Sequence, residues 1–408
     1  MSGIVERIKK NKKLYETLVR VAKSYEYFKN HMVAKVVWKV CSHLPVQEDK
    51  VYFSNFNGRG FADNQKYIAL EILKRKQAGS LKRDYKLFWV LQNPKEQKLP
   101  KGIQPVKIGT IKEIYHMATA KYWINNVRIN QYFIKRKNQC YIQTWHAGLG
   151  FKRIEKDIEE SLSPEYIRMA KIDSAAIDLI VSNGPFMTNH FKRIFWYDGE
   201  FLEKGHPRND LFFQYGEKEK AKIYKRLGIP LERKTVLYAP TFRSDYGLSA
   251  YDCDYDRLLK ALKKRFGGEW SLLVRLHPNL FDKFDDLNLK GEDILNVSSY
   301  SDMQELLFAA DVMVTDFTSA MFEFAIMDKP CFIYASDLEV YMKERGLITL
   351  DEVPFPKTDS NEGLEEMILS YEEESYRNKV HDFMKDKCCD KGIGAASVVD
   401  WMEEQVWI

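Results

Sequence analysis

Residues 312–323 read Val-Met-Val-Thr-Asp-Phe-Thr-Ser-Ala-Met-Phe-Glu, and this stretch carries the strongest signal for the fold class. Its first four residues predict a buried β-strand that ends at Thr315, and an apolar helix follows. Thr318 and Ser319 open that helix, where free backbone N–H groups and the helix dipole favour a bound phosphate. The same two hydroxyls also fit an ordinary N-cap, so the pattern leaves both interpretations open.

β-rich runs alternate with helical patterns on both sides of this stretch, from about residue 50 onward. The first series predicts strands at Lys50–Phe56, Tyr85–Leu91, Gln104–Ile108, Tyr122–Val127, Gln139–Trp145 and Leu179–Ser182. The second series predicts strands at Thr235–Ala239, Ser271–Leu276, Ile294–Val297, Val312–Thr315 and Cys331–Tyr334. Such alternation indicates parallel sheets covered on both faces by helices. We therefore expect an α/β protein of two Rossmann-like domains that face a cleft, with ligands bound beyond the carboxyl ends of the strands.

Proline and glycine interrupt the chain between residues 204 and 234, and we place the domain boundary in that region. The predicted parts are a basic amphipathic helical segment at 1–48, an N-terminal Rossmann-like domain at 49–205, a C-terminal Rossmann-like domain at 206–375, and C-terminal helices at 376–408.

The 408-residue chain is 45% hydrophobic, which suits a globular protein of two or three domains. No stretch approaches the ~20 uncharged apolar residues that a membrane span requires, and no secretion signal is evident. The six cysteines are scattered and none forms a CxxC pair, which is typical of a reducing compartment. The sequence thus indicates neither a disulfide framework nor a zinc site.

The N-terminal segment is strongly basic. Ten Lys or Arg residues lie between Arg7 and Lys39, and apolar residues recur among them. This pattern fits a helix on an anionic membrane surface, and it fits equally well a solvated helical arm packed on its own protein. Nucleic acid is not expected as a partner, because no recognisable nucleic-acid-binding module is present.

Polar side chains also follow three other predicted strands. Arg275 and His277 come at one strand end, on the same side by the two-residue period. Arg243 follows another strand, and a guanidinium can hold a phosphate with two parallel hydrogen bonds. His146 ends a strand of the first series, just before two glycines, and an imidazole suits proton transfer near neutral pH. The plainer alternatives are that His146 and His277 have structural roles and that Arg243 is a solvent-exposed charge in a loop.

Several familiar motifs are absent from the sequence. It has no Walker A loop, no GxGxxG, no HExxH and no GxSxG, which argues against P-loop, zincin and α/β-hydrolase readings. Asp252-Cys253-Asp254 matches the DxD pattern of a metal-nucleotide clamp. It follows a glycine-containing loop, however, and so predicts a surface turn.

The ordered set of motifs is more specific than any one of them. Its members are Ser54–Arg59, Asp63–Tyr67, Trp145–Gly148, Gly205–Asp210, Ala239–Arg243, Arg275–Pro278, Thr315–Ser319, Lys329–Pro330 and Asp337–Glu339. In this order they resemble the CDP-glycerol glycerophosphotransferase family of teichoic acid and capsule synthesis. The resemblance covers roughly residues 50 to 400.

The resemblance implies a GT-B-like architecture, with an acceptor domain first and the nucleotide donor held mainly by the C-terminal domain. It implies transfer of a polyol phosphate from a CDP-alcohol, with release of CMP. The residues present no obvious metal site and no cofactor is expected, while metal dependence stays open. By this likeness His146 and His277 are the expected catalytic residues, with His146 as the base for the acceptor hydroxyl. The expected donor-binding residues are Arg243, Arg275, Thr241, Asp316, Thr318, Ser319 and Glu323. The expected acceptor or loop residues are Gly148, Arg208 and Asn209.

The sequence leaves the substrate open in several respects. The donor is CDP-glycerol or CDP-ribitol, and the acceptor is a lipid-linked polymer or primer. A GT-B glycosyltransferase or epimerase that uses a nucleotide sugar is one rival, and a non-catalytic binding protein is another. Two departures from the family pattern, Ala147-Gly148-Leu149 and His206, could alter the acceptor or the polyol. We expect a cytoplasmic protein attached peripherally to the inner face of the bacterial cell membrane.

Overall fold

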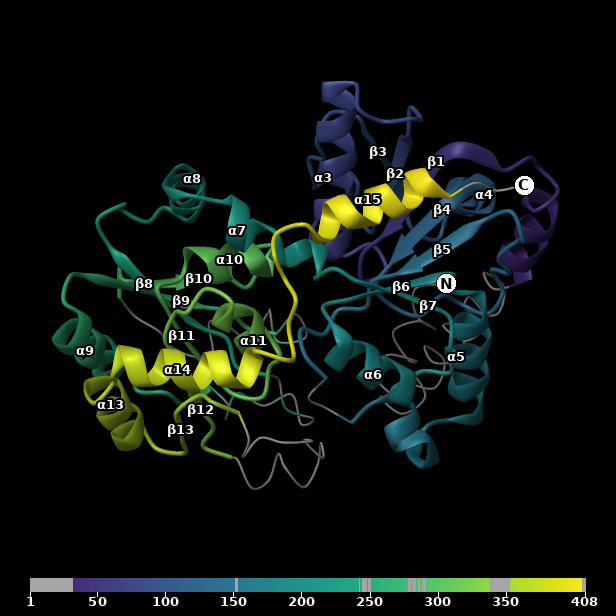
Figure 1. The fold of residues 1–408 in the computed structure, drawn as a ribbon. Helices are drawn as coiled ribbons and strands as arrows, with labels where there is room; N and C mark the ends of the chain where they lie inside the picture. The colour runs from purple at the N-terminus through teal and green to yellow at the C-terminus, as the bar shows by residue number, and fades with distance from the viewer. Residues whose placement is uncertain are drawn as a thin grey trace, which may run out of the picture.

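The computed structural model describes residues 32–150, 153–241, 243, 248, 251–277, 280, 284, 287, 291–337 and 353–405. These residues form two α/β units that lie side by side, each built on one parallel sheet flanked by helices (Figure 1). The two parallel sheets flanked by helices confirm the predicted α/β class and its two sheets.

The first sheet has seven parallel strands in the order β3-β2-β1-β4-β5-β6-β7. The strands are β1 (Gln47–Ser54), β2 (Lys86–Leu91), β3 (Ile103–Lys107), β4 (Ala120–Asn125), β5 (Cys140–Gln143), β6 (Leu179–Ser182) and β7 (Glu200–Glu203). Every residue of β4, β5 and β6 is buried, as expected for central strands covered on both faces. Ser54 pairs with Asn125, so β1 and β4 end side by side.

Several helical segments connect the strands of this first sheet. They are α3 (Asp63–Ala78), α4 (Ile111–Thr119), the 3-10 helix η1 (Glu155–Ser161), α5 (Pro164–Ala176) and α6 (Pro185–Ile194). α4 begins where the Thr110 hydroxyl accepts the Glu113 N–H, and α3 ends at Gly79, whose φ of 66° suits glycine.

The second sheet has six parallel strands in the order β10-β9-β8-β11-β12-β13. The strands are β8 (Lys234–Tyr238), β9 (Trp270–Val274), β10 (Ile294–Asn296), β11 (Val312–Thr315), β12 (Cys331–Tyr334) and β13 (Lys357–Thr358). The apolar run at 312–315 is fully buried in the centre of this sheet, which explains its strong sequence signal.

The other labelled helices all come after β7 in the chain. They are η2 (Pro207–Asn209), α7 (Leu211–Gln214), α8 (Glu217–Leu227), α9 (Tyr255–Phe266), α10 (Met303–Ala309), α11 (Ala320–Ala325), α13 (Asn361–Leu369), α14 (Glu373–Met384) and α15 (Gly394–Glu404). α14 lies with the second sheet, whereas α15 returns to the first unit and packs against α3 (Figure 1). The Asp210 carboxylate accepts the first N–H groups of α15, from Gly394 and Ala395, and so fixes this return.

Most strands lie close to their predicted positions, and Leu179–Ser182, Val312–Thr315 and Cys331–Tyr334 lie at the predicted residues. The edge strands β7 and β13 were not predicted. The surface turn predicted at Asp252–Asp254 is instead a helix start, because Asp254 caps α9 and Cys253 is buried. The boundary predicted between residues 205 and 206 falls between β7 and η2, and the domain limits stay predictions.

Only the end of the basic segment belongs to the described chain. Residues 32–41 are helical, and Trp38 and Cys41 pack into the core of the first unit. The rest of the predicted arm, residues 1–31, lies outside the described residues. Within the described ranges, no helix is long and apolar enough to cross a membrane.

Candidate active site between the two sheets

The point where the strand order reverses in each sheet gathers most of the polar residues singled out from the sequence. This switch point lies between β1 and β4 in the first sheet and between β8 and β11 in the second. Loops that leave two such strands in opposite directions open a crevice at the carboxyl edge, where ligands of α/β proteins bind. The loops of interest therefore begin after Ser54, Asn125, Tyr238 and Thr315.

His146 follows β5, and the neighbouring strand end fixes its imidazole. The ring Nδ1 lies 2.7 Å from the carbonyl oxygen of Asn126, the residue after β4. Because a carbonyl oxygen only accepts, Nδ1 carries the proton and Nε2 keeps a lone pair that can accept one. Burial lowers the pKa of His146, which favours the neutral ring at neutral pH. The arrangement suits a general base.

The loop of His146 touches the second unit at Gly148. The Gly148 N–H donates to the Ser319 hydroxyl oxygen over 3.4 Å. A Cβ atom on Gly148 would lie 2.9 Å from Cγ of Glu323, so only glycine permits this approach without a shift. The loop after β5 and the loop after β11 therefore meet across the two sheets.

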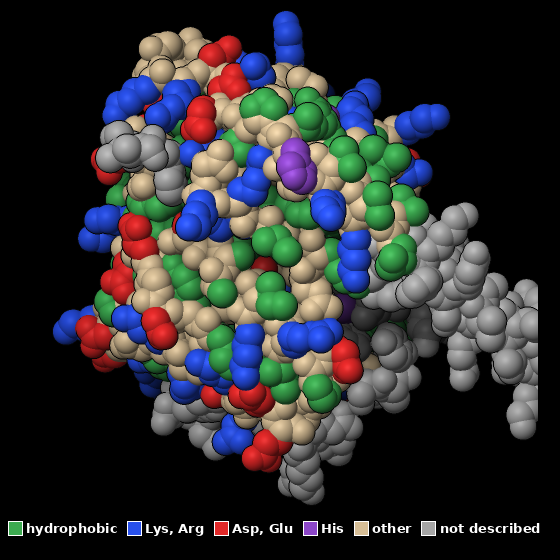
Figure 2. Space-filling model, turned by 90° about the vertical axis from the view of Figure 1, so that its right-hand side faces the viewer, with side chains coloured by type: hydrophobic (Ala, Val, Ile, Leu, Met, Phe, Trp, Pro, Cys, Tyr) green, Lys and Arg blue, Asp and Glu red, His purple; other side chains and the backbone are tan. Residues whose placement is uncertain are grey.

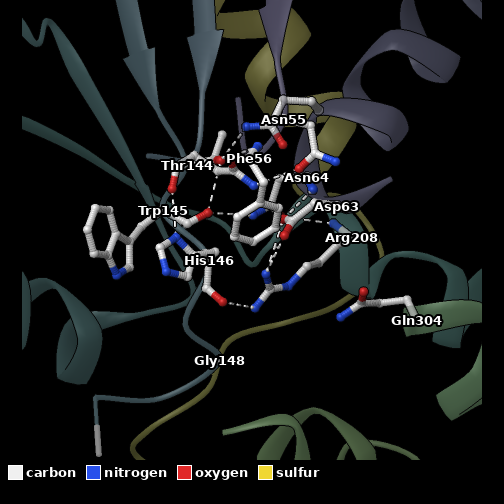
Figure 3. Close-up of polar contacts among 12 residues, drawn as sticks. Asn55, Phe56, Asp63, Asn64, Thr144, Trp145, His146, Gly148, Arg208 and Gln304 are labelled. Atoms are coloured by element: carbon white, nitrogen blue, oxygen red, sulfur yellow. Dashed lines mark hydrogen bonds and ion pairs between the residues drawn. The ribbon is translucent and has the colours of Figure 1, made fainter. Parts of the chain in front are cut away.

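Arg208 is the buried centre of this junction, with 3% of its surface exposed. Its guanidinium donates to Glu323 Oε1 at 2.7 Å, to both Asp63 oxygens at 3.1 Å, and to the His146 carbonyl oxygen at 3.1 Å. Figure 3 shows the Arg208 side chain reaching Asp63 and the His146 backbone. One cation thus joins α3 of the first unit, α11 of the second unit and the histidine loop.

A second buried ion cluster lies beside the first. Lys66 on α3 pairs with Asp302 at 2.5 Å and with Glu305 at 2.8 Å, both from the second unit, and all three are buried. The Tyr67 hydroxyl also donates to Asp302. Each of these charges is desolvated, so loss of one half of the cluster would leave the other half buried without its counter-charge.

Arg243 is tied to carboxylates of its own unit. Its guanidinium bonds both oxygens of Asp337 and lies 2.9 Å from Asp316 Oδ2. The Thr241 N–H donates to the other oxygen of Asp316 at 2.7 Å. Arg243, Thr241 and Asp316 therefore form one compact loop structure at the β8–β11 switch point, with the arginine charge balanced by two aspartates.

Arg275, just past β9, has different surroundings. Its guanidinium donates to the carbonyl oxygen of Tyr300 at 2.7 Å. In the part of the chain that the structure describes, no carboxylate lies within ion-pair distance of it. Burial lowers the pKa of Arg275 to about 10, so the group stays charged at neutral pH. His277 lies two residues further along the chain. Its backbone N–H donates to the Tyr251 hydroxyl oxygen.

The start of α11 departs from an ordinary cap. Ser319 occupies the N-cap position with helical backbone angles, and its side chain makes no capping bond. Its hydroxyl accepts from Gly148 instead, while the Thr318 hydroxyl accepts from Ala320 N. α11 has only six residues, so the predicted apolar helix is shorter than expected and its dipole contributes less.

The structure brings His146, Gly148, Arg208, Ser319 and Glu323 into direct or shared contacts. Arg243, Thr241 and Asp316 form the separate loop structure described above, and Arg275 with His277 lies on the adjoining strand end. Asn209 instead donates to Asp390, in the segment that leads to α15. The catalytic and binding roles of these residues stay predictions.

Sequence reasoning missed Asn126, which anchors the imidazole. Its position directly after a predicted strand of the first series was the available signal, because strand ends at one carboxyl edge meet in space. The described residues contain no group of three or more His, Cys, Asp or Glu side chains placed to hold a metal ion.

Comparison with known proteins gives the family. Residues 36–399 match the family described as CDP-Glycerol:Poly(glycerophosphate) glycerophosphotransferase. The chain belongs to this family.

Two curated relatives cover most of this chain. The teichoic acid poly(glycerol phosphate) polymerase of Bacillus subtilis (strain 168) is 29% identical over 385 residues, which are 90% of this chain and 50% of that protein. A polymerase of the same name from Bacillus spizizenii is 28% identical over 381 residues, which are 90% of this chain and 95% of that protein. The chain therefore spans about half the length of the first relative.

Solved structures of this family share the whole arrangement. A structure of the wall teichoic acid polymerase TagF, soaked with CDPG, has a TM-score of 0.81 at 26% identity and covers 95% of this chain and 98% of that chain. A UDP-N-acetylglucosamine 2-epimerase structure from Listeria monocytogenes, at 14% identity and a TM-score of 0.53, shares the fold alone. A teichoic acid poly(ribitol-phosphate) polymerase of Bacillus spizizenii is 27% identical over 84% of this chain and 55% of that protein.

The Arg208 junction generates a stability prediction. Arg208→Met leaves Asp63 and Glu323 buried without their counter-charge, so we expect the free energy of unfolding to fall by about 3–5 kcal/mol in urea titrations. Arg377→Met is the matched control, because it removes a pair with Glu373, at 3.2 Å, in which both side chains are largely exposed, and it should cost less than about 1 kcal/mol. Equal, small losses in both variants would contradict the role given to Arg208.

Proposed function

We propose that this chain transfers glycerol phosphate from CDP-glycerol to a hydroxyl of a membrane-linked teichoic acid or capsule acceptor, and releases CMP. The observation that carries the proposal is the contact between Gly148 and Ser319, which joins the loop of a proton-accepting imidazole to the loop after β11. Membership of the family and the glycerol phosphate polymerases among the relatives support the same reaction.

The proposed step is a displacement at phosphorus. The acceptor oxygen attacks the phosphorus that bears glycerol, a P–O bond to the acceptor forms, and the P–O bond to CMP breaks with its electron pair leaving on CMP. His146 takes the acceptor proton through Nε2. Phosphoryl transfer depends mainly on positioning and on cations around the developing negative charge, so the protein need not form a covalent intermediate.

The donor diphosphate needs positive charge on the side of the second unit. Arg275 is suited to this because, among the described residues, only carbonyl oxygens bond its guanidinium. Arg243 is bonded to Asp316 and Asp337. We therefore propose that Arg243 fixes the conformation of the loop after β8, in addition to making the predicted phosphate contact. Together with His277 and the loop of Thr318 and Ser319, these residues form the proposed donor site.

Two rival activities share parts of this geometry. CDP-ribitol is the first alternative donor, because ribitol phosphate polymerases are also among the relatives. A nucleotide-sugar enzyme such as an epimerase is the second, since its fold is similar. Incubation with CDP-glycerol, CDP-ribitol or UDP-N-acetylglucosamine and a membrane extract is followed by chromatography of both the released nucleotides and the nucleotide sugars. A transferase releases CMP, an epimerase converts the nucleotide sugar into its epimer, and a non-catalytic binding protein changes neither.

With the preferred donor we expect CMP release that depends on the extract. His146→Ala should slow this release by about 10²–10⁴-fold, because a positioned general base contributes that much to proton transfer. Calorimetric affinity for the donor should stay within a few-fold of wild type. Undiminished CMP release by the His146→Ala enzyme would remove the assigned role.

Donor binding supplies an independent prediction. Arg275→Ala removes a charge-assisted contact to the diphosphate, so the affinity for CDP-glycerol should fall by about 10–100-fold in calorimetry. Arg257→Ala, on α9, is the control and should leave the affinity unchanged, because that arginine pairs with the exposed Glu362. Unchanged affinity in a folded Arg275→Ala protein would place the diphosphate elsewhere.

We propose that the protein works at the inner face of the cell membrane, where a lipid-linked acceptor is available. The helix at 32–41 supports this by its outward face, on which Val33, Val36 and Val40 are exposed. A neighbouring groove is lined by Lys35, Lys39, Ile134, Lys135, Arg136 and Arg168, among others. Figure 2 shows hydrophobic and basic side chains intermingled on this side of the molecule. Such a mixture suits an anionic lipid surface.

Vesicle flotation tests this surface. The double variant Val36→Asp/Val40→Asp removes apolar contact and adds negative charge, so its binding to phosphatidylglycerol vesicles should weaken by about tenfold or more. Leu231→Asp is the control, because this side chain is similarly exposed, at 65%, on the second unit. Equal flotation of the wild-type protein and the Val36→Asp/Val40→Asp variant would exclude the 32–41 helix from membrane contact.

A further inference from the structure

The loop after β1 has an unusual backbone for its residue types. Phe56, Asn57 and Gly58 have φ angles of 41°, 54° and 83°, so three consecutive residues are left-handed. Glycine adopts this region freely and asparagine tolerates it, whereas a phenylalanine there is strained. Strain of this kind persists only where surrounding contacts impose it, and it clusters at functional sites.

Those contacts come from the neighbouring strand end. Asn126 Oδ1 accepts the Phe56 N–H at 2.9 Å, and Asn126 Nδ2 donates to Asn55 Oδ1 at 2.9 Å. Asn126 is fully buried. Its backbone carbonyl is also the group that bonds His146 Nδ1. One asparagine therefore holds the strained loop and the imidazole at the same time.

The strained loop presents the Phe56 ring to His146. Their ring centroids lie 5.1 Å apart, and the Trp145 ring lies 4.5 Å from the imidazole in a stacked arrangement. Figure 3 shows the imidazole between these two aromatic side chains. Phe56 is itself half-buried.

We propose that Phe56 is a positioning residue for His146, whose ring holds the imidazole against Trp145 and keeps water from it, so that Nε2 faces the acceptor hydroxyl. The inference rests on the proposed function, because it concerns the same proton transfer. Phe56 itself exchanges no proton and bonds no substrate atom. Its contribution is the fixed orientation of the base, and misplacement of a reacting group by about 1 Å can cost on the order of 10²-fold in rate.

The same packing affects the charge state of the base. Burial is the largest cause of the lowered pKa of His146, and the backbone bond to Asn126 opposes it. The charged groups that act on the ring are Asp63 and Glu155, which raise its pKa, and Arg208, which lowers it. Removal of the Phe56 ring admits water and leaves these three groups in place. The pKa of His146 should then rise toward its ordinary value.

The test compares Phe56→Ala with Phe56→Tyr, which keeps the ring. Phe56→Ala should lower kcat for CMP release by about 10–100-fold while the KM for CDP-glycerol changes less than about threefold. The acid limb of its kcat/KM profile should move to higher pH, because more of the imidazole is protonated at a given pH. Phe56→Tyr should restore both properties. Phe186→Ala, at a partly exposed ring on α6, controls for the loss of an aromatic side chain.

An NMR titration of the His146 ring in wild type and in folded Phe56→Ala gives a readout that needs no activity. Phe56→Leu keeps most of the apolar volume, so its ring pKa should stay closer to that of wild type. A higher pKa of His146 in Phe56→Ala supports the proposal. Wild-type kcat and pH profile in folded Phe56→Ala, or an unchanged ring pKa in that variant, overturns it. If wild type releases no CMP, the proposed function fails instead, whereas the ring titration still decides the packing of Phe56 on His146.

Discussion

The arrangement of the site depends on one buried guanidinium, that of Arg208. It bonds Asp63 at the start of α3, Glu323 in α11 and the carbonyl oxygen of His146, so it contacts a helix of each unit and the histidine loop at once. Two carboxylates and one cation in the interior stabilise the fold only when their geometry is good, because desolvation of each charge is costly. The contribution of these three side chains is to fix the positions of the groups they bond. The orientation of one sheet toward the other and the location of the His146 backbone are set by the same atoms.

The second requirement is that the loop after β5 approaches the loop after β11 closely. This is possible because Gly148 has no side chain. Gly148 lies where a Cβ atom would be 2.9 Å from Glu323, the residue that Arg208 holds. The imidazole in turn needs Asn126, whose carbonyl bonds Nδ1 and whose amide holds the strained turn at Phe56. Backbone strain and buried charge are thus concentrated in a small region between the units. The hydrogen bonds of buried side chains offset both, which is the pattern expected where a site must be rigid before its substrate arrives.

The sequence predicted the parts of this structure that depend on local signals. Central parallel strands are continuous apolar runs, so 312–315 and 331–334 were located to the residue, whereas β7 (Glu-Phe-Leu-Glu) and the two-residue β13 are short, part-polar edge strands without that signal. Residues at strand ends, such as His146 and Arg275, were found because topology places strand ends together. Partners distant in the chain were not found. Asp337, 94 residues from Arg243, balances a charge that the sequence alone presents as free, and Asn126 acts on His146 largely through a backbone carbonyl.

The contrast between Arg243 and Arg275 bears on where an anion can bind. Arg243 already has two carboxylates, so a diphosphate that approached it would be repelled by Asp316 and Asp337 or would have to replace one of them. Arg275 bonds only neutral carbonyl oxygens among the described residues, and it is buried enough for its pKa to fall to about 10. A buried cation without a carboxylate partner gains more from an incoming anion than one that is already neutralised, because the anion offsets a desolvation cost already incurred. We therefore propose that anion recognition in this unit centres on the end of β9, with Arg243 in the loop that follows the neighbouring strand β8.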